Sequence, residues 1–356
     1  MQTWNKIKSW PLFLPVLALI LVMAVNIIHD AATGINPLSF FEISLRDTTT
    51  NGTILYGRII DVINRGSEVA ILAIGMTLVV SASAGTDISV GSVMSLCASF
   101  MCMTLAGYGV SSTTTLARPL IVGLLAAVLM GVVCGAFNGT LVAHLSIQPM
   151  VATLILYSAA RAIGLLVCND LIVYVRNPSF AFIGAFLGPI PTPIIITAVC
   201  IIVVSIVLRK TALGMYIQSV GINAKASRIA GLNSKLLIFL AYTLCGVFAS
   251  IAGIVASSRI TSADSNNIGL YLEMDAILSV ALGGNSLGGG KFNLSGSIIG
   301  AYTIQAITTT LYALGVSSIQ APVYKAIIVI IIVVIEAPPF KAFIRKHSAA
   351  GKGVRA

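Results

Sequence analysis

The stretch PLIVGLLAAVLMGVVCGAFNGTLVA (residues 119–143) carries no charged residue. A helix needs about 20 mainly apolar residues to cross the hydrocarbon core of a bilayer. This stretch is long enough, so it predicts a transmembrane helix. Gly131, Gly135 and Gly139 recur at every fourth position, a spacing that lets two helices approach closely. We expect this face to pack within the chain, with a dimer seam as the alternative.

The composition extends this interpretation to the whole chain. Hydrophobic residues make up 57% of the 356 positions and charged residues only 9%, against about 25% in soluble domains. We therefore predict an all-α polytopic membrane protein with a single transmembrane domain over residues 1–356. The net charge of +10 does not indicate nucleic-acid binding, because the Lys and Arg residues lie mostly at the ends of apolar runs.

The apolar runs predict about ten transmembrane segments, some of them short or broken. The run near 272–283 is too short to span alone. We interpret residues 10–28 as a retained first helix, because the apolar run is longer than that of a typical signal peptide. The runs are 11–28, 59–82, 88–107, 119–143, 149–168, 189–208, 236–257, 272–283, 294–315 and 320–337.

The distribution of basic residues predicts the orientation. With ten crossings and both termini in the cytoplasm, the inner segments hold 13 of the 21 Lys and Arg residues, as the positive-inside rule requires. The longest inner loop, 209–235, keeps helical spacing and predicts a short amphipathic helix. Such a helix rests on membrane lipid or fits a groove on a partner. The other inner segments are 1–10, 83–87, 144–148, 284–293 and the tail 338–356.

Polar groups within the apolar runs are candidate functional residues. Asp87 lies between two runs in AGTDISVGS (residues 84–92). It either belongs to a broken helix lining a solute path or caps the next helix. Arg161 could pair with an acid such as Asp87 or Asp275, whereas we expect Lys325 to extend toward the membrane interface. The acidic stretch 262–275 is either a solvated outer loop or a surface for an external partner.

The sequence predicts no nucleotide-binding, metal-binding or catalytic site in this chain. The loop GGNSLGGGKF (residues 283–292) has a glycine-rich, lysine-containing composition, but Asn285 and Phe292 occupy positions where a nucleotide-binding P-loop needs Gly and Ser or Thr. We interpret it as a tight turn between two short membrane elements. The six cysteines and three histidines are scattered, so we expect no metal site and no enzyme.

Several local motifs together resemble the ribose- and galactose-type permeases of ABC importers. The residues of these motifs are most similar to those of galactofuranose-type members. Two departures are Ala84-Gly85, where the family usually has Gly-Gly, and Gly221-Ile222-Asn223, where ribose-type members have Gly-Gly-Asn. The resemblance covers nearly all of residues 59–337. Its motifs are Gly75–Val79, Thr86–Ser92, Ile147–Thr153, Gly214–Gly231, Leu272–Ile277 and Gly283–Gly290.

The resemblance implies a membrane subunit that moves a monosaccharide across the bacterial inner membrane by alternating access. Its partners would be a cytoplasmic ABC ATPase, a periplasmic sugar-binding protein and a second permease copy or a similar permease. ATP would bind the ATPase, so this chain would carry no cofactor. The alternatives are a permease of the same superfamily for a non-sugar solute, such as a branched-chain amino acid, and an ion-coupled secondary transporter.

The resemblance also gives roles to individual residues. The inner loop would couple to the ATPase, and sugar hydroxyls call for hydrogen-bonding groups along the path. The ATPase-coupling candidates are Gly214, Gly221, Asn223, Ala226 and Gly231. The path candidates are Asp87, Ser89, Asn138, Thr153 and Arg161.

Overall fold

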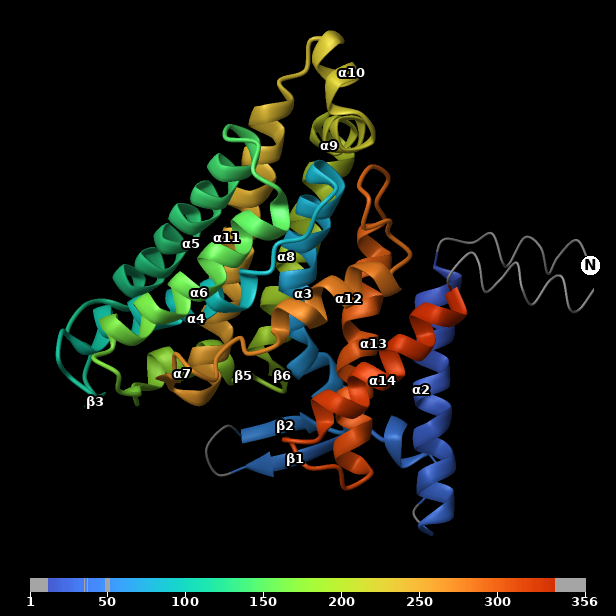
Figure 1. Ribbon diagram of the computed structural model, residues 1–356. Coiled ribbons are helices and arrows are strands. Elements are labelled where there is room, and N and C mark those ends of the chain that lie inside the picture. Colours follow the sequence, from blue (N-terminus) through green and yellow to red (C-terminus); the bar gives the residue numbers. More distant parts are fainter. Residues whose placement is uncertain (1–11, 35, 37, 49–51, 337–356) are drawn as a thin grey trace, which may run out of the picture.

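The computed structural model describes residues 12–34, 36, 38–48 and 52–336, so the predicted inner segment 1–10 and the tail 338–356 lie outside it. Each of the ten predicted apolar runs coincides with one helix (Figure 1). The helices are α2 (Phe13–Ala32), α3 (Arg58–Ser83), α4 (Val90–Ala106), α5 (Leu120–Ala143), α6 (Pro149–Val167), α7 (Pro178–Gly184), α8 (Thr192–Lys210), α9 (Leu213–Ile222), α10 (Ala224–Ile229), α11 (Ser234–Ile260), α12 (Leu272–Leu282), α13 (Leu294–Ala313) and α14 (Ala321–Glu336), with a 3-10 turn η1 (Ser39–Phe41).

Six of these helices are long and apolar enough to cross a membrane: α2, α3, α5, α6, α8 and α11. Helix α4 is apolar but has only 17 residues, and α12 has 11. The prediction of short elements among the membrane runs is therefore confirmed. The total of ten crossings remains a prediction.

Short strands also occur, so the chain is mostly helical rather than strictly all-α. β1 (Ser44–Thr48) and β2 (Gly52–Tyr56) form an antiparallel hairpin. The other strands have two or three residues each, too few for a periodic sequence signal. They are β3 (Ser112–Thr113), β4 (Val173–Val175) and β7 (Ser262–Ala263) in one sheet, and β5 (Phe186–Leu187) and β6 (Ile190–Pro191) in another.

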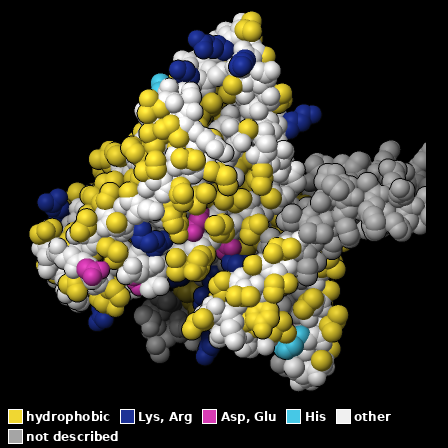
Figure 2. Space-filling model, viewed as in Figure 1, with side chains coloured by type: hydrophobic (Ala, Val, Ile, Leu, Met, Phe, Trp, Pro, Cys, Tyr) yellow, Lys and Arg dark blue, Asp and Glu magenta, His cyan; other side chains and the backbone are white. Residues whose placement is uncertain are grey.

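Helix α3 is the centre of the bundle. Its apolar window is 89% buried, against 28% for α5 and 22% for α8, and it packs against α11, α13, α12 and α8. The outer helices expose apolar side chains instead, which cover much of the surface in Figure 2. The interior is apolar as well, and an exterior that is also apolar suits a protein whose solvent is lipid.

The glycine stripe of α5 packs against α11. An added Cβ at Gly135 would lie 2.8 Å from the Cα of Thr243, and one at Gly139 would lie 2.9 Å from the carbonyl oxygen of Phe239. Only glycine permits this backbone approach. The expectation that the stripe packs within the chain is confirmed.

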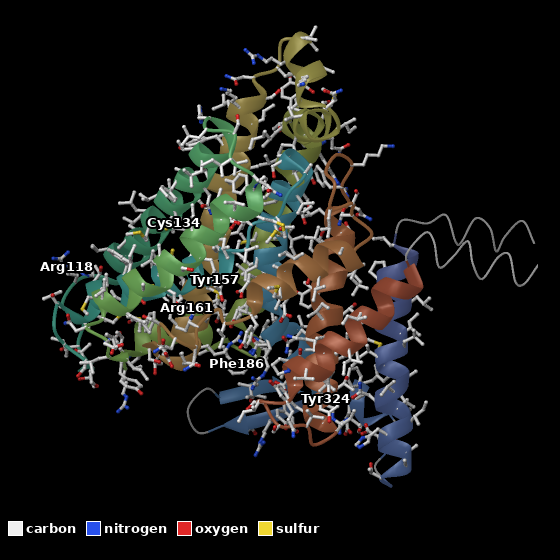
Figure 3. All side chains as sticks on the ribbon, viewed as in Figure 1. Arg118, Cys134, Tyr157, Arg161, Phe186 and Tyr324 are labelled. Atoms are coloured by element: carbon white, nitrogen blue, oxygen red, sulfur yellow. The ribbon has the colours of Figure 1, made fainter. Side chains whose placement is uncertain are left out.

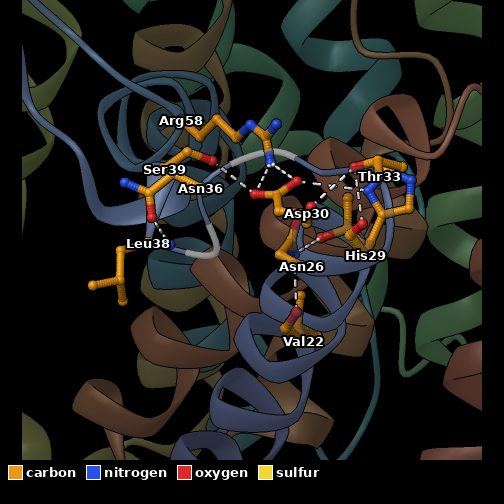
Figure 4. A network of polar contacts seen from close by, with 10 residues as sticks. Val22, Asn26, His29, Asp30, Thr33, Asn36, Leu38, Ser39 and Arg58 are labelled. Atoms are coloured by element: carbon orange, nitrogen blue, oxygen red, sulfur yellow. Dashed lines mark hydrogen bonds and ion pairs between the residues drawn. The ribbon is translucent and has the colours of Figure 1, made fainter.

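The first helix is attached through a buried carboxylate. Asp30 in α2 is fully buried and accepts hydrogen bonds from Nη1 of Arg58 at 2.8 and 2.9 Å and from the hydroxyl of Ser39 at 2.8 Å (Figure 4). One turn earlier, the Asn26 amide donates to Thr310 of α13 at 2.6 Å. These contacts fasten α2 to η1, α3 and α13, and they were not predicted from the sequence.

Helices α9 and α10 lie at one end of the bundle, and the β1–β2 hairpin lies at the other (Figure 1). Loop 209–235 is helical as predicted, but it forms two helices that meet at Asn223, and the apolar side chain of Ile229 in α10 is exposed. The two ends of the molecule therefore differ in structure: one is helical and the other is a β-hairpin, and α3 runs between them.

Candidate functional site

The segment between α3 and α4 is non-helical from Ala84 to Ser89. Ala84 has a left-handed φ of +53° and ends α3, its N–H donating to the carbonyl of Val80 at 3.1 Å. The Gly- and Ser-rich composition of this stretch predicted such a break. Irregular backbone inside an apolar bundle needs polar partners, and the following side chains supply them.

Asp87 is buried at 3% exposure in this segment. Its Oδ1 accepts a hydrogen bond from the backbone N–H of Ser89 at 2.8 Å and another from the Ser89 hydroxyl at 2.6 Å. The carboxylate thus holds an Asx turn just before α4. Ser89 is the N-cap residue of α4 and no side chain in the described structure caps its first turn, so the capping interpretation is not confirmed. Its place in a solute path remains a prediction.

Two other helices complete the cluster, which we name the α4 polar cluster (Asp87, Ser89, Asn138 and Thr153). Asn138 of α5 donates to the Ser89 hydroxyl at 2.9 Å, and its Nδ2 lies 3.5 Å from both Asp87 carboxylate oxygens. The hydroxyl of Thr153 in α6 accepts the backbone N–H of Ile88 at 3.2 Å. Four of the five path candidates therefore meet at one place.

The α4 polar cluster has hydrogen-bonding capacity to spare. Within the part of the chain that the structure describes, no Lys, Arg or His lies within ion-pair distance of Asp87, and Thr86 Oγ1, Ser92 Oγ and Asn138 Oδ1 are buried without a partner. A buried polar atom without a hydrogen-bond partner lowers the stability of the protein unless water or a ligand binds to it. The three atoms could accept or donate to hydroxyl groups of a solute.

Arg161 does not join the cluster. It lies on α6 two turns beyond Thr153 (Figure 3) and donates to the carbonyl oxygens of Ser265 and Asn266, both at 2.7 Å, and of Ile268 at 3.3 Å. The expectation that it pairs with Asp87 or Asp275 is wrong. The guanidinium fork instead fixes the backbone that leads into α12, where three carbonyls converge.

The coupling candidates lie on or beside the α9–α10 end. Asn223 accepts the Ala226 N–H at 3.0 Å and so caps α10, and Gly231 ends this region with a φ of +88°. Gly214 and Gly221 face inward against the bundle. Ile229 is 89% exposed, and Lys225 and Arg228 are exposed beside it, so this end presents a mixed basic and apolar surface (Figure 2).

The comparisons with known proteins fit this arrangement. A family model described as "Branched-chain amino acid transport system / permease component" matches residues 58–336. The chain belongs to this permease family. It is 41% identical to the galactofuranose transporter permease protein YtfT of Escherichia coli K12 over 339 residues, which cover 94% of this chain and 93% of the relative.

Two further relatives are import permeases. The permease is 38% identical to the fructose import permease protein FruF of Bifidobacterium longum, covering 80% of this chain and 78% of the relative. It is 33% identical to the ribose import permease protein RbsC of Escherichia coli K12, covering 83% and 90%. With the apolar helices, family membership makes the chain a multi-pass inner-membrane protein.

In the permease, Lys325 of α14 forms an ion pair rather than reaching the membrane interface. Its Nζ lies 2.7 and 2.8 Å from the two carboxylate oxygens of Asp275 in α12. The expectation of an interfacial Lys325 is wrong, because a carboxylate in the first turn of a short helix lies within its reach. The stretch 262–275 is likewise not simply a solvated loop, since Ser265, Glu273 and Asp275 are buried.

Some residues of the site were missed from the sequence. Thr86 and Ser92 flank Asp87 and share its burial, and Glu273 Oε2 is buried without a partner in the described structure. An added Cβ at Gly91 would collide with Glu273, which places this acid beside the start of α4. The hydroxyl groups of Thr86 and Ser92 could have been predicted as site residues, because they lie close to Asp87 in the sequence. Glu273 lies in the predicted acidic stretch 262–275, but its position beside α4 could not be predicted, because the two are about 180 residues apart.

Proposed function

We propose that the permease imports a monosaccharide, galactofuranose or a related sugar, as a membrane subunit of a binding-protein-dependent ABC importer. A separate cytoplasmic ATPase drives the cycle, a periplasmic sugar-binding protein delivers the solute, and a second permease subunit completes the channel. The chain itself carries out no chemical reaction and binds no nucleotide.

The observation that carries this proposal is the 41% identity to a galactofuranose transporter permease along 94% of the chain. The fructose and ribose permeases add two further sugars at lower identity. Relatives that transport different monosaccharides share polar hydroxyl-rich solutes, and this matches a path lined with hydrogen-bonding groups.

The two ends of the molecule support an orientation. We place the α9–α10 end in the cytoplasm, where it fits a groove on the ATPase, because Arg209, Lys210, Lys225, Arg228 and Lys235 cluster around it. The hairpin end then faces the periplasm. In this orientation the chain crosses the membrane ten times and both termini are cytoplasmic.

The α4 polar cluster is the part of the path that we assign to solute contact. Asp87, Asn138 and Ser89 come from two different elements and retain unpartnered atoms beside them. Rocking of α4 against α5 and α6 would separate these elements and expose the atoms to a sugar. The hydrogen bonds that now join the elements would then pass to sugar hydroxyls.

The substrate class is tested with the periplasmic binding protein that the proposal requires. We expect it to bind galactofuranose or another monosaccharide and to leave leucine unbound, and labelled uptake by cells expressing the complete importer should follow the same order. Binding of leucine with no sugar binding would favour the branched-chain amino acid alternative, which the description of the family makes the second candidate.

A further inference from the structure

Three glycines meet where α3 ends, and we name this contact the glycine junction (Gly221, Gly289 and Gly290, around the Ser81 carbonyl). The backbone N–H of Gly290 donates to the carbonyl oxygen of Ser81 at 3.1 Å. An added Cβ at Gly221, the second-last residue of α9, would lie 2.7 Å from Gly290 N and 2.8 Å from the Ser81 carbonyl carbon. Three backbones therefore touch without intervening side chains.

Gly289 and Gly290, on the loop side of the junction, require glycine for two reasons: their backbone conformation and the lack of space for a side chain. Gly289 and Gly290 have φ values of +85° and +91°, which side-chain-bearing residues rarely adopt. An added Cβ at Gly289 would lie 2.9 Å from the Ala84 Cβ, and one at Gly290 would lie 2.8 Å from Cγ1 of Ile222. The loop is thus wedged between the end of α9 and the residue that ends α3.

The glycine-rich loop is itself held rigidly. Asn285 donates to the Ser297 hydroxyl at 2.8 Å and to the carbonyl of Val280 at 3.1 Å, and its side-chain oxygen accepts the N–H of Asn293. The Thr77 hydroxyl of α3 donates to the same Ser297 at 2.7 Å. Both ends of the loop are therefore joined to α12, α13 and α3, which limits how far the loop can move away when α9 is displaced.

The other side of the junction leads directly to the α4 polar cluster. Ala84 begins the non-helical segment, and Asp87 follows three residues later. An added Cβ at Gly85 would lie 2.5 Å from Cγ of Pro149, the first residue of α6. Thr153, which accepts the Ile88 N–H, lies one turn further along that helix. A shift at the end of α3 would therefore reach both α4 and α6.

We propose that the glycine junction transmits movement of α9–α10 to the segment 84–89 during the ATP-driven cycle. Gly221, Gly289 and Gly290 are positioning residues: they touch neither solute nor ATPase, but their direct backbone contact makes α9 and the end of α3 move together. This rests on the proposed function, because it requires an ATPase acting on the α9–α10 end.

The test uses the complete complex, with ATPase and binding protein, in proteoliposomes. Gly221→Ala inserts one methyl group against the Ser81 carbonyl and leaves the exposed face of α10 unchanged. We expect the ATPase to stay bound and to hydrolyse ATP, while the number of ATP molecules hydrolysed per sugar imported rises at least tenfold. Gly289→Ala should act in the same direction.

Gly288→Ala is the matched control. It lies in the same loop, is not among the positive-φ glycines, and an added Cβ would meet only Ser286 Oγ at 3.4 Å. We expect it to keep the wild-type ratio. If Gly221→Ala does not fold, Gly290→Ala replaces it: its φ of +91° adds backbone strain, but its extra methyl meets mainly the flexible Ile222 side chain instead of the Ser81 backbone.

The outcomes separate the two proposals. A folded Gly221→Ala or Gly290→Ala complex with the wild-type ratio of ATP to sugar would overturn the role of the glycine junction alone, including when hydrolysis and uptake fall together. Absence of ATP-dependent uptake in the wild-type complex would overturn the proposed function, whatever the variants do.

Discussion

Asp87 and Asp275 are both buried carboxylates at the start of short helices, but the protein satisfies them differently. Asp275 lies within 2.8 Å of Lys325, an ion pair that joins α12 to α14. Among the residues that the structure describes, Asp87 meets only the N–H and hydroxyl of Ser89 and the amide of Asn138. A buried ion pair holds two helices in one arrangement, whereas hydrogen bonds to small polar groups can be exchanged for those of a solute.

The ion pair should give the largest effect on stability. Lys325→Met leaves Asp275 buried without its cation, which we expect to lower the free energy of unfolding by about 3 kcal/mol. Thermal unfolding of the detergent-solubilised protein measures this. Lys210→Met is the control, because Lys210 is exposed and makes no ion pair in the described structure. The double variant with Asp275→Leu should recover most of the loss, and a neutral single variant would contradict the structural role of the pair.

The Asp87→Asn variant should distinguish a role of Asp87 in solute transport from a purely structural role. The isosteric amide keeps an oxygen that can accept the Ser89 N–H, so we expect assembly and the unfolding temperature to stay near those of the wild type. Import should fall about tenfold, because charge-assisted hydrogen bonds are roughly twice as strong as neutral ones. Loss of folded protein would show that Asp87 acts only by holding the turn before α4, and normal import would remove it from the path.

Arg161→Lys should give the smallest effect of the three. An ammonium group is a compact donor and cannot reproduce the fork that contacts three carbonyls. We expect a loss of about 1 kcal/mol in the free energy of unfolding, with faster amide hydrogen exchange in residues 264–270. Exchange at the wild-type rate there would mean that the loop before α12 is held by other contacts.

These contrasts also explain what could be predicted from the sequence. All ten apolar runs coincide with helices, and the six that are long and apolar enough to cross a membrane are predictable because crossing a bilayer requires about 20 mainly apolar residues. Asp87, Ser89, Asn138 and Thr153 are predicted from the sequence as hydrogen-bonding groups for sugar hydroxyls, and they meet because buried polar groups need hydrogen-bond partners. The partners of the two partly buried cations were not predicted by this reasoning. Arg161 and Lys325 each had several acceptors within possible reach, and only the packing of α6, α12 and α14 decides which one is used.

The glycine-rich loop shows a second limit. Its composition correctly predicted a tight turn, and positive φ at Gly284, Gly289 and Gly290 confirms it. Its neighbours at Ser81 and Gly221 could not be predicted, because they lie far away in sequence and make backbone contacts that leave no pattern of side chains.

The central claim is that a separate ATPase drives this permease. The most direct measurement is the initial rate of sugar uptake into proteoliposomes that hold the permease with or without the ATPase, with the binding protein supplied on the delivery side. We predict uptake only when the ATPase and ATP are both present, and no uptake from a proton or sodium gradient alone. Gradient-driven uptake by the permease without the ATPase would contradict the account and identify an ion-coupled transporter.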